Sequence, residues 1–172
     1  MSSPLVLIYN LPIDKLTITT GTGNYGQITN VDWGDGTIDT KKTHTYALSG
    51  TYTVKVEGTG ITHLEIPRAS KPFLIGCTSF GTIGLKDLTA AFDGCIALVT
   101  APETLPPGVT VTMSMFKGAT AFDGDINGWD VSSVTNMSYM FLNATSFNKP
   151  LNNWNVSNTL NMVFQIGDKF GI

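Results

Sequence analysis

Two stretches of the chain decide its organisation: MFKGATAFDGDINGWDVSSVTNM at residues 115–137 and MFLNATSFNKPLNNWNVSNTLNM at residues 140–162. Eleven positions carry the same residue in both stretches at a spacing of 25, as Phe116 and Phe141 do. A repeat of this length indicates a stack of similar units, none of which closes a hydrophobic core alone. We therefore expect Phe116 and Phe141 to be buried in an apolar column that runs through this half of the chain.

Weaker copies of the unit lie nearer the N-terminus. Residues 92–98 align with residues 116–122 at a spacing of 24, and residues 74–80 align with residues 92–98 at a spacing of 18. The alignment predicts that one column passes through all copies and consists of Leu74, Phe92, Phe116, Phe141 and Ile166.

Each unit is predicted to hold a short strand and a helical turn. We expect the strands on the Trp-x-Val triplets at residues 129–131 and 154–156, or on the equivalent residues 64–66 and 98–101. The helical turn is expected over residues 136–141, because Met137, Met140 and Phe141 have the i, i+3, i+4 spacing of one helix face. Spacings near 24 lie in the leucine-rich-repeat range, so residues 61–172 are expected to form a solenoid of about four coils.

Residues 1–60 follow a different pattern. Short runs rich in β-branched and aromatic residues alternate there with clusters of Gly and Asn, which is typical of an antiparallel β-sandwich. The expected fold class is therefore mainly β with short helices: a small β-sandwich at residues 1–60 fused to a solenoid at residues 61–172. No Gly/Ser-rich or Pro-rich spacer separates Val56 from Ile61, so the two parts are expected to form one rigid body.

Motifs in both parts resemble known families. The order VDWGDGT at residues 31–37, HTY at 44–46 and GTYTV at 50–54 resembles the polycystic-kidney-disease (PKD) type of immunoglobulin-like domain. WDVSSVTNMSYMF at residues 129–141 resembles the repeats of bacterial surface proteins, and the unit at residues 92–98 resembles BspA-like leucine-rich repeats. The resemblance implies a surface or adhesive protein, with related modules also found in viruses.

Composition excludes some classes of partner. Charged residues make up 13% of the chain, the formal net charge is -3, and the Lys and Arg residues are scattered singly. This distribution offers no basic stripe to a phosphate backbone, so no nucleic-acid partner is expected. The apolar run between Pro4 and Pro12 is too short for a signal-peptide core or a membrane span, so we also expect no span.

No catalytic, cofactor-binding or metal site is predicted. Asp32, Asp35 and Asp39 are interpreted as turn formers, because their spacing lacks the alternating ligands of an EF-hand. A calcium-binding loop stays open as the alternative. Cys77 and Cys95 fall at equivalent places in the aligned copies. Both a disulfide and two buried free thiols therefore stay open.

The expected function is a non-catalytic protein-binding or structural surface module, acting in adhesion or assembly on a protein or surface-glycan partner. One alternative is a virion protein that cements or decorates a capsid or tail, with neighbouring capsid or surface-layer subunits as partners. Another is an accessory domain of a carbohydrate-active enzyme. The expected location is thus the cell surface, the extracellular space or a virion. Binding is assigned to Trp129 and Trp154 if they point outward, and otherwise to the loops around Asn143 and Asn152.

Overall fold

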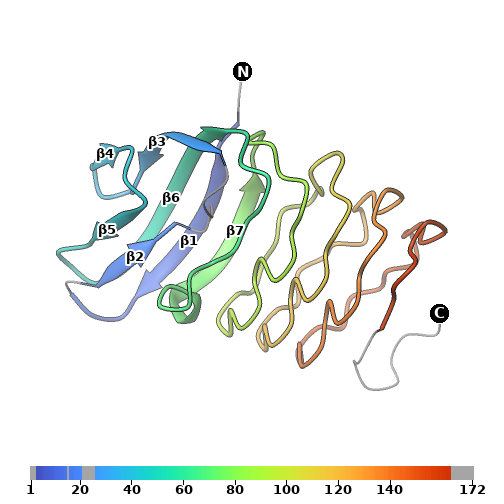
Figure 1. Cartoon of the computed structure of the whole chain (residues 1–172). Helices are drawn as coiled ribbons and strands as arrows, with labels where there is room; N and C mark the ends of the chain where they lie inside the picture. Colours follow the sequence, from blue (N-terminus) through green and yellow to red (C-terminus); the bar gives the residue numbers. More distant parts are fainter. Residues whose placement is uncertain (1–2, 15, 21–25, 164–172) are drawn as a thin grey trace.

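The computed structural model describes residues 3–14, 16–20 and 26–163. The strands gather at one end of the molecule, and the rest of the chain extends from them as a row of loops that lie side by side (Figure 1). Within the described ranges, no helix has both the length and the apolar character needed to cross a lipid bilayer.

A five-stranded antiparallel sheet forms the first part, in the order β4-β3-β6-β1-β7. Its strands are β1 (Leu5–Leu11), β3 (Gln27–Asp32), β4 (Ile38–Asp39), β6 (Gly50–Thr59) and β7 (Leu74–Phe80). The strands β2 (Thr17–Thr19) and β5 (Thr43–Thr45) pair as a separate two-stranded sheet, and one 3-10 turn, η1 (Lys71–Phe73), precedes β7. Period-2 alternation on β1 buries every second side chain against the core.

The motif at residues 31–37 forms the turn between β3 and β4. Asp32, Asp35 and Asp39 each accept a hydrogen bond from the backbone N–H two residues further on. These are Asx-turn contacts, the role predicted for the three aspartates. Gly34 has a φ of 79°, and a Cβ there would lie 2.6 Å from the Thr53 carbonyl oxygen, so only glycine fits. In the described part, no group of three or more His, Cys, Asp or Glu residues is arranged to hold a metal ion.

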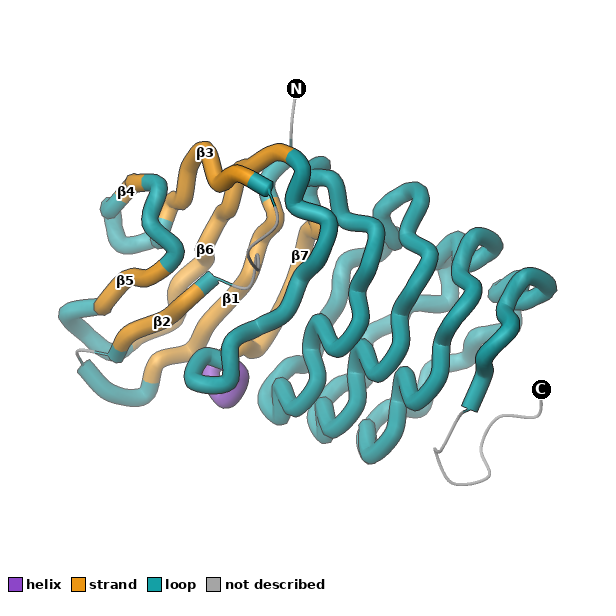
Figure 2. The backbone as a smooth tube through the Cα atoms, in the orientation of Figure 1, coloured by secondary structure: helices purple, strands orange, loops and turns teal. Residues whose placement is uncertain are grey.

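The predicted fusion of an immunoglobulin-like β-sandwich with a leucine-rich-repeat solenoid is wrong. The main sheet takes its edge strand, β7, from beyond residue 60, and the second sheet has two strands of three residues each. Between Gly81 and Val163 the described chain forms no strand and no helix, as the uniform loop colouring of Figure 2 shows. The protein is a small, mostly β structure with almost no helix. The division of the chain at residue 60 stays a prediction.

The row of loops is held together by single parallel bridges. One line of bridges joins His63 to Asp87, Asp87 to Val111, Val111 to Asn136, and Asn136 to Asn161. The spacing is 24 residues for the first two steps and 25 for the next two. We call the successive segments layer 1 (61–84), layer 2 (85–108), layer 3 (109–133) and layer 4 (134–158).

The predicted helical turn over residues 136–141 is wrong. Tyr139 has a φ of 59° and Asn143 a φ of 60°, and an α-helix does not tolerate left-handed residues at this spacing. Two backbone donors of this segment bond to the chain beyond layer 4, Met137 N–H to Asn161 O at 2.9 Å and Tyr139 N–H to Val163 O at 2.7 Å, and Met140 N–H donates three residues back to Met137 O, not four. Pairing between layers has replaced the helix.

Stacked aromatic rings fill the core of the layers. Phe116 and Phe141 are fully buried, as predicted, with ring centroids 5.7 Å apart. The ring centroid of Phe92 lies 5.6 Å from that of Phe116. The next ring along the column after Phe92 is Phe80, with centroids 6.3 Å apart, and not the predicted Leu74.

The predicted offset of 18 residues before Phe92 is wrong. Gly76 bridges Thr100, and Val99 N–H donates to Ile75 O, so layer 1 also lies on layer 2 at a spacing of 24. Cys77 and Cys95 therefore occupy different places in their layers. Both are free thiols, and burial raises the pKa of each, for Cys95 to about 12. The predicted column position Ile166 lies outside the described residues.

Candidate binding cleft

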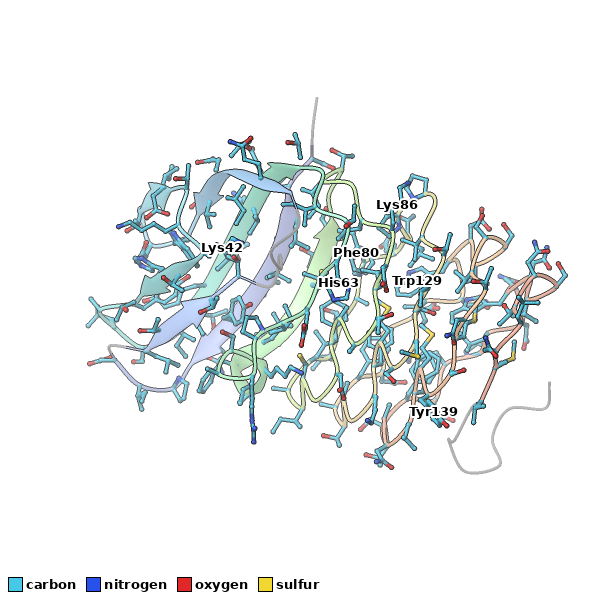
Figure 3. The ribbon with its side chains drawn as sticks, in the orientation of Figure 1. Lys42, His63, Phe80, Lys86, Trp129 and Tyr139 are labelled. Carbon is cyan, nitrogen blue, oxygen red and sulfur yellow. The ribbon has the colours of Figure 1, made fainter. Side chains whose placement is uncertain are left out.

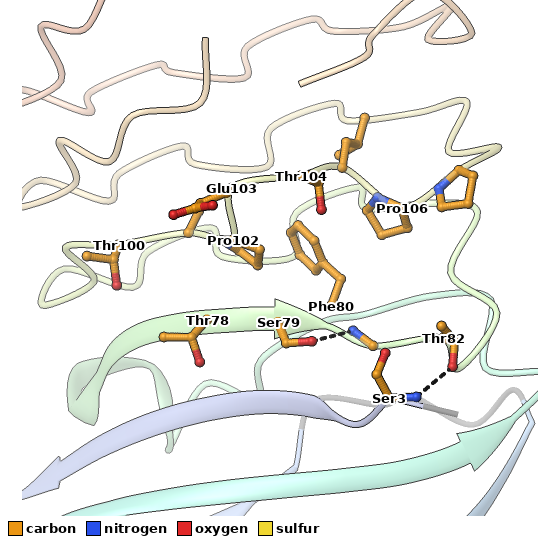
Figure 4. Close-up of a pocket in the computed structure, with 14 residues that line it drawn as sticks. Ser3, Thr78, Ser79, Phe80, Thr82, Thr100, Pro102, Glu103, Thr104 and Pro106 are labelled. Atoms are coloured by element: carbon orange, nitrogen blue, oxygen red, sulfur yellow. Dashed lines mark hydrogen bonds between the residues drawn. The ribbon is translucent and has the colours of Figure 1, made fainter. Parts of the chain in front are cut away.

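A cleft of about 590 Å³ opens where β7 and layer 2 diverge. Up to the Gly76–Thr100 bridge the two segments are paired, but β7 then stays with β1 while the chain after Thr100 bends away. The segment that faces β7 contains Pro102, Pro106 and Pro107, which have no N–H with which to continue the ladder. Figure 4 shows the two walls and the gap between them. The lining consists of Ser3, residues 78–82 and residues 100–107.

The floor of the cleft is apolar and rigid. Phe80 is only 4% exposed, and it points from β7 toward the proline-rich wall (Figure 4). Its ring centroid lies 6.0 Å from that of Trp129, a contact that can be followed in Figure 3. The Trp129 indole N–H donates to Pro102 O at 2.8 Å, which fixes the opposite wall to layer 3. Core packing thus holds both walls apart.

The rim is made of uncharged polar groups and one carboxylate. At the N-terminal corner, Ser79 Oγ donates to Pro4 O, and Ser3 N–H donates to Thr82 Oγ1, both at 2.9 Å. The remaining polar side chains of the rim are exposed and make no hydrogen bond or ion pair within the described part. They belong to Thr78, Thr100, Glu103 and Thr104.

Backbone donors of the layer 2 wall also lack partners among the described residues, and the β7 wall carries a bulge. Thr78 is the extra residue of a β-bulge, because Leu7 pairs with Cys77 and Val6 with Ser79. On the opposite wall, the backbone N–H groups of Glu103 and Thr104 donate no hydrogen bond to any described residue. The residues that line the cleft therefore include backbone donors without a described partner, above an apolar floor.

Comparison with known proteins places the chain in a family. Residues 76–170 match the family model described as "Mycoplasma protein of unknown function, DUF285", which is more than half of the 172 residues. The chain belongs to the DUF285 family. The family that matches is not the PKD type or the BspA-like leucine-rich repeats, so both resemblances drawn from the motifs are wrong as family assignments. No curated protein and no solved structure matches the chain.

The DUF285 match begins within β7 and includes every cleft residue except Ser3. The repeat pattern points to other residues as the binding surface. Trp129 is 2% exposed and belongs to the core, and Trp154 is half-buried on top of it, with ring centroids 6.5 Å apart. Asn143 and Asn152 are exposed, but neither lines the cleft.

A signal for the cleft is present in the sequence. Three prolines fall within residues 102–107, the part of layer 2 that corresponds to the Trp-containing segment of layer 3. Without the spatial register, this cluster gives no indication of which strand it faces. The rim residues Thr78, Glu103 and Thr104 were therefore missed.

Far from the cleft, the β3–β4 turn holds a closely paired carboxylate. His44 Nε2 lies 2.7 Å from Asp35 Oδ2, and the His44 ring stacks on Trp33 at 5.1 Å. Partial burial by itself would raise the pKa of Asp35, but hydrogen bonds from the Thr37 N–H and from His44 outweigh it and lower that pKa. The pair ties the turn to β5 and so acts as a structural contact.

Proposed function

We propose that this chain is a non-catalytic protein-binding module that acts in adhesion or assembly, and that the cleft between β7 and layer 2 is its binding site. The observation that carries the proposal is the pair of walls with unpartnered polar groups over a buried apolar floor. Binding sites typically combine such an apolar base with a few placed polar groups.

The chemistry of the lining supports recognition over catalysis. It consists of Ser and Thr hydroxyls, apolar side chains, glycine and a single carboxylate, Glu103. An active site would pair a nucleophile or a general acid with a base that orients it. Phe80 is too buried to serve as a platform for a sugar ring, so a protein partner fits better than a glycan. No specific observation favours the virion setting or the role beside a carbohydrate-active enzyme, and both stay predictions.

A displayed library of random peptides, selected on the full chain, tests this function. Thr104→Arg places a long cation over the cleft from an exposed rim position, and Thr29→Arg makes the same change on β3, which is not a cleft element. We expect the selected peptides to bind the parent chain and Thr29→Arg equally, and Thr104→Arg at least about tenfold more weakly, because the new side chain reaches over the buried floor on which a peptide would pack. The proposal fails if no peptide is retained, or if Thr104→Arg binds as the parent does.

A further inference from the structure

We infer that the cleft takes its partner as an extended strand beside β7, with a basic side chain against Glu103. The inference rests on the proposed function and names the chemistry and backbone conformation of the segment that is bound. It follows from the way β7 uses its two bulges, from the unused backbone donors of layer 2 and from the charge of the cleft.

The two bulges of β7 supply the internal precedent. Ile75 is the first extra residue, since Ile8 pairs with Gly76 and Tyr9 with Leu74. Its carbonyl oxygen accepts the Val99 N–H of layer 2 at 2.9 Å, so this bulge is completed by a neighbouring chain segment. Thr78 is the second extra residue, three positions on, and layer 2 has left β7 at that point. A peptide segment bound in the cleft would donate a backbone hydrogen bond at the Thr78 bulge, as Val99 does at the Ile75 bulge.

Layer 2 presents the matching donors. In layer 3, the Asn127 N–H is capped by Asp125 Oδ1 and the Trp129 N–H closes a turn onto Ile126 O, both at 3.1 Å. The corresponding residues of layer 2, 24 positions earlier, are Glu103 and Leu105, and their N–H groups make neither bond. Ala101 stands where Asp125 stands in layer 3, so it has no side-chain oxygen with which to cap the loop. Backbone N–H groups that are bonded within layer 3 are therefore free in layer 2 to bind a partner.

These unpartnered groups favour an extended occupant. A bound strand offers alternating C=O and N–H groups to both walls, which is how strand addition to a sheet edge obtains its affinity. A helix would keep its backbone groups to itself and could satisfy neither wall.

Charge selects the side chain. Glu103 is the only charged residue of the lining, it is exposed, and no described cation pairs with it. The whole chain carries a formal charge of -3. A Lys or Arg side chain on the face of the bound strand that points away from the floor would complement the Glu103 carboxylate and the negative net charge of the chain.

Peptides from the selection described above supply the probe. We expect most of them to carry Lys or Arg, and binding by the full chain to weaken about threefold in Glu103→Gln and about tenfold in Glu103→Lys, in the range of a solvent-exposed ion pair and its reversal. Glu65→Lys is the matched control, because Glu65 is an exposed glutamate of layer 1 outside the lining, and it should bind as the parent does.

N-methylation of single peptide bonds tests the extended backbone. It removes one N–H at a time, and alternate positions should weaken binding about tenfold while the positions between them change little. Peptides that bind without a basic residue, or that tolerate both Glu103→Lys and every N-methylation, would overturn the inference and leave the proposed function standing. A chain that retains no peptide at all removes the proposed function itself.

Discussion

Single side chains hold the layers together through two kinds of contact, stacked rings and hydroxyl-to-carbonyl bonds. The Thr135 hydroxyl donates to Thr110 O at 3.2 Å, and the Thr159 hydroxyl donates to Val134 O at 2.9 Å. The first bond joins layer 4 to layer 3, and the second joins the segment after layer 4 to layer 4. These threonines do part of the work that a continuous strand ladder does elsewhere, while the rings exclude water from the core.

Removal of one ring from the column should be costly. Phe116 stacks on rings from its own layer and from both neighbours, so Phe116→Ala leaves a cavity that the rigid stack cannot close. We expect the free energy of unfolding in denaturant to fall by about 3–5 kcal/mol. Asp123→Asn is the control: its oxygen can still accept the Asn148 N–H, and only an exposed pair with Lys149 is lost, so the change should stay within about 0.5 kcal/mol. Equal damage by both substitutions would show that the column is not the source of stability.

The carboxylate of Asp35 should make stability depend on pH. Its pKa is lower in the folded chain than in the unfolded chain, so it stabilises the fold above the unfolded value near pH 4 and loses this effect as the pH falls through the folded value. Asp35→Asn keeps a side-chain oxygen for the Thr37 N–H but removes the charge beside His44. Denaturant unfolding should show a larger gap between parent and variant at pH 6 than at pH 2.5. A gap of the same size at both values, or the same trend in Glu65→Gln, would contradict this assignment.

At the scale of elements, β7 is the strand that connects the main sheet to the layers. It pairs with β1 along one edge, and it bridges layer 2 at one residue of the other edge. At the first of its two bulges the Ile75 carbonyl oxygen accepts the Val99 N–H of layer 2, and the second bulge, at Thr78, lines the cleft. The cleft exists because β7 follows β1 beyond the point where layer 2 bends away.

The end of β7 should be sensitive to a single methyl group. Gly81 has a φ of 65°, and a Cβ there would lie 2.5 Å from Leu5 N and 2.6 Å from Pro4 C, both backbone atoms. Gly81→Ala should therefore destabilise the chain by about 3 kcal/mol or more, as strain and overpacking add. Gly36→Ala, at a φ of 94° with nothing within 4 Å of the new Cβ, should cost only about 1 kcal/mol. Thermal melts of the two variants compare these costs, and equal shifts would argue against the close approach of β7 to the start of β1.

Sequence patterns predict some of these elements and mislead on others. The 25-residue spacing correctly identifies Phe116 and Phe141 as stacked and buried, because a repeated column needs only its period to be recognised. The 18-residue offset failed because residues 74–80 resemble residues 92–98 in letters while their backbone pairs with β1. Similarity between two short segments reflects the size of their side chains. It does not determine which strand each segment pairs with, because that pairing depends on the whole sheet.

The candidate site was harder to predict than the fold. Trp129 is conspicuous in the sequence, yet its periodic register with Phe116 is the register of a core residue. Thr78 and Glu103 attract no attention individually, because a threonine and a glutamate are ordinary on a surface. Their significance comes from the parting of β7 and layer 2, which depends on contacts between segments that are distant in the chain.

At the scale of the whole molecule, one continuous core joins the sheet to the layers. Buried residues run without a break from Leu5 in β1 to Leu151 in layer 4. Because β7 closes one edge of the main sheet, residues 1–60 alone lack both that strand and the layers beneath it.

A fragment of residues 1–60 should consequently fail to fold. So short a segment buries too little apolar surface to offset its conformational entropy. Calorimetry should show no cooperative transition for the fragment and one transition for the full chain. A cooperative melt of the fragment near that of the full chain would mean that the sheet does not depend on β7.

The most direct test of the binding cleft is an NMR titration of the labelled full chain with a selected peptide. We predict that the backbone amide signals of Thr78, Glu103 and Thr104 shift and that those of Asn143 and Asn152 stay in place. Shifts centred on Asn143 and Asn152, with the cleft amides unchanged, would contradict this prediction and assign binding to the loops of layer 4.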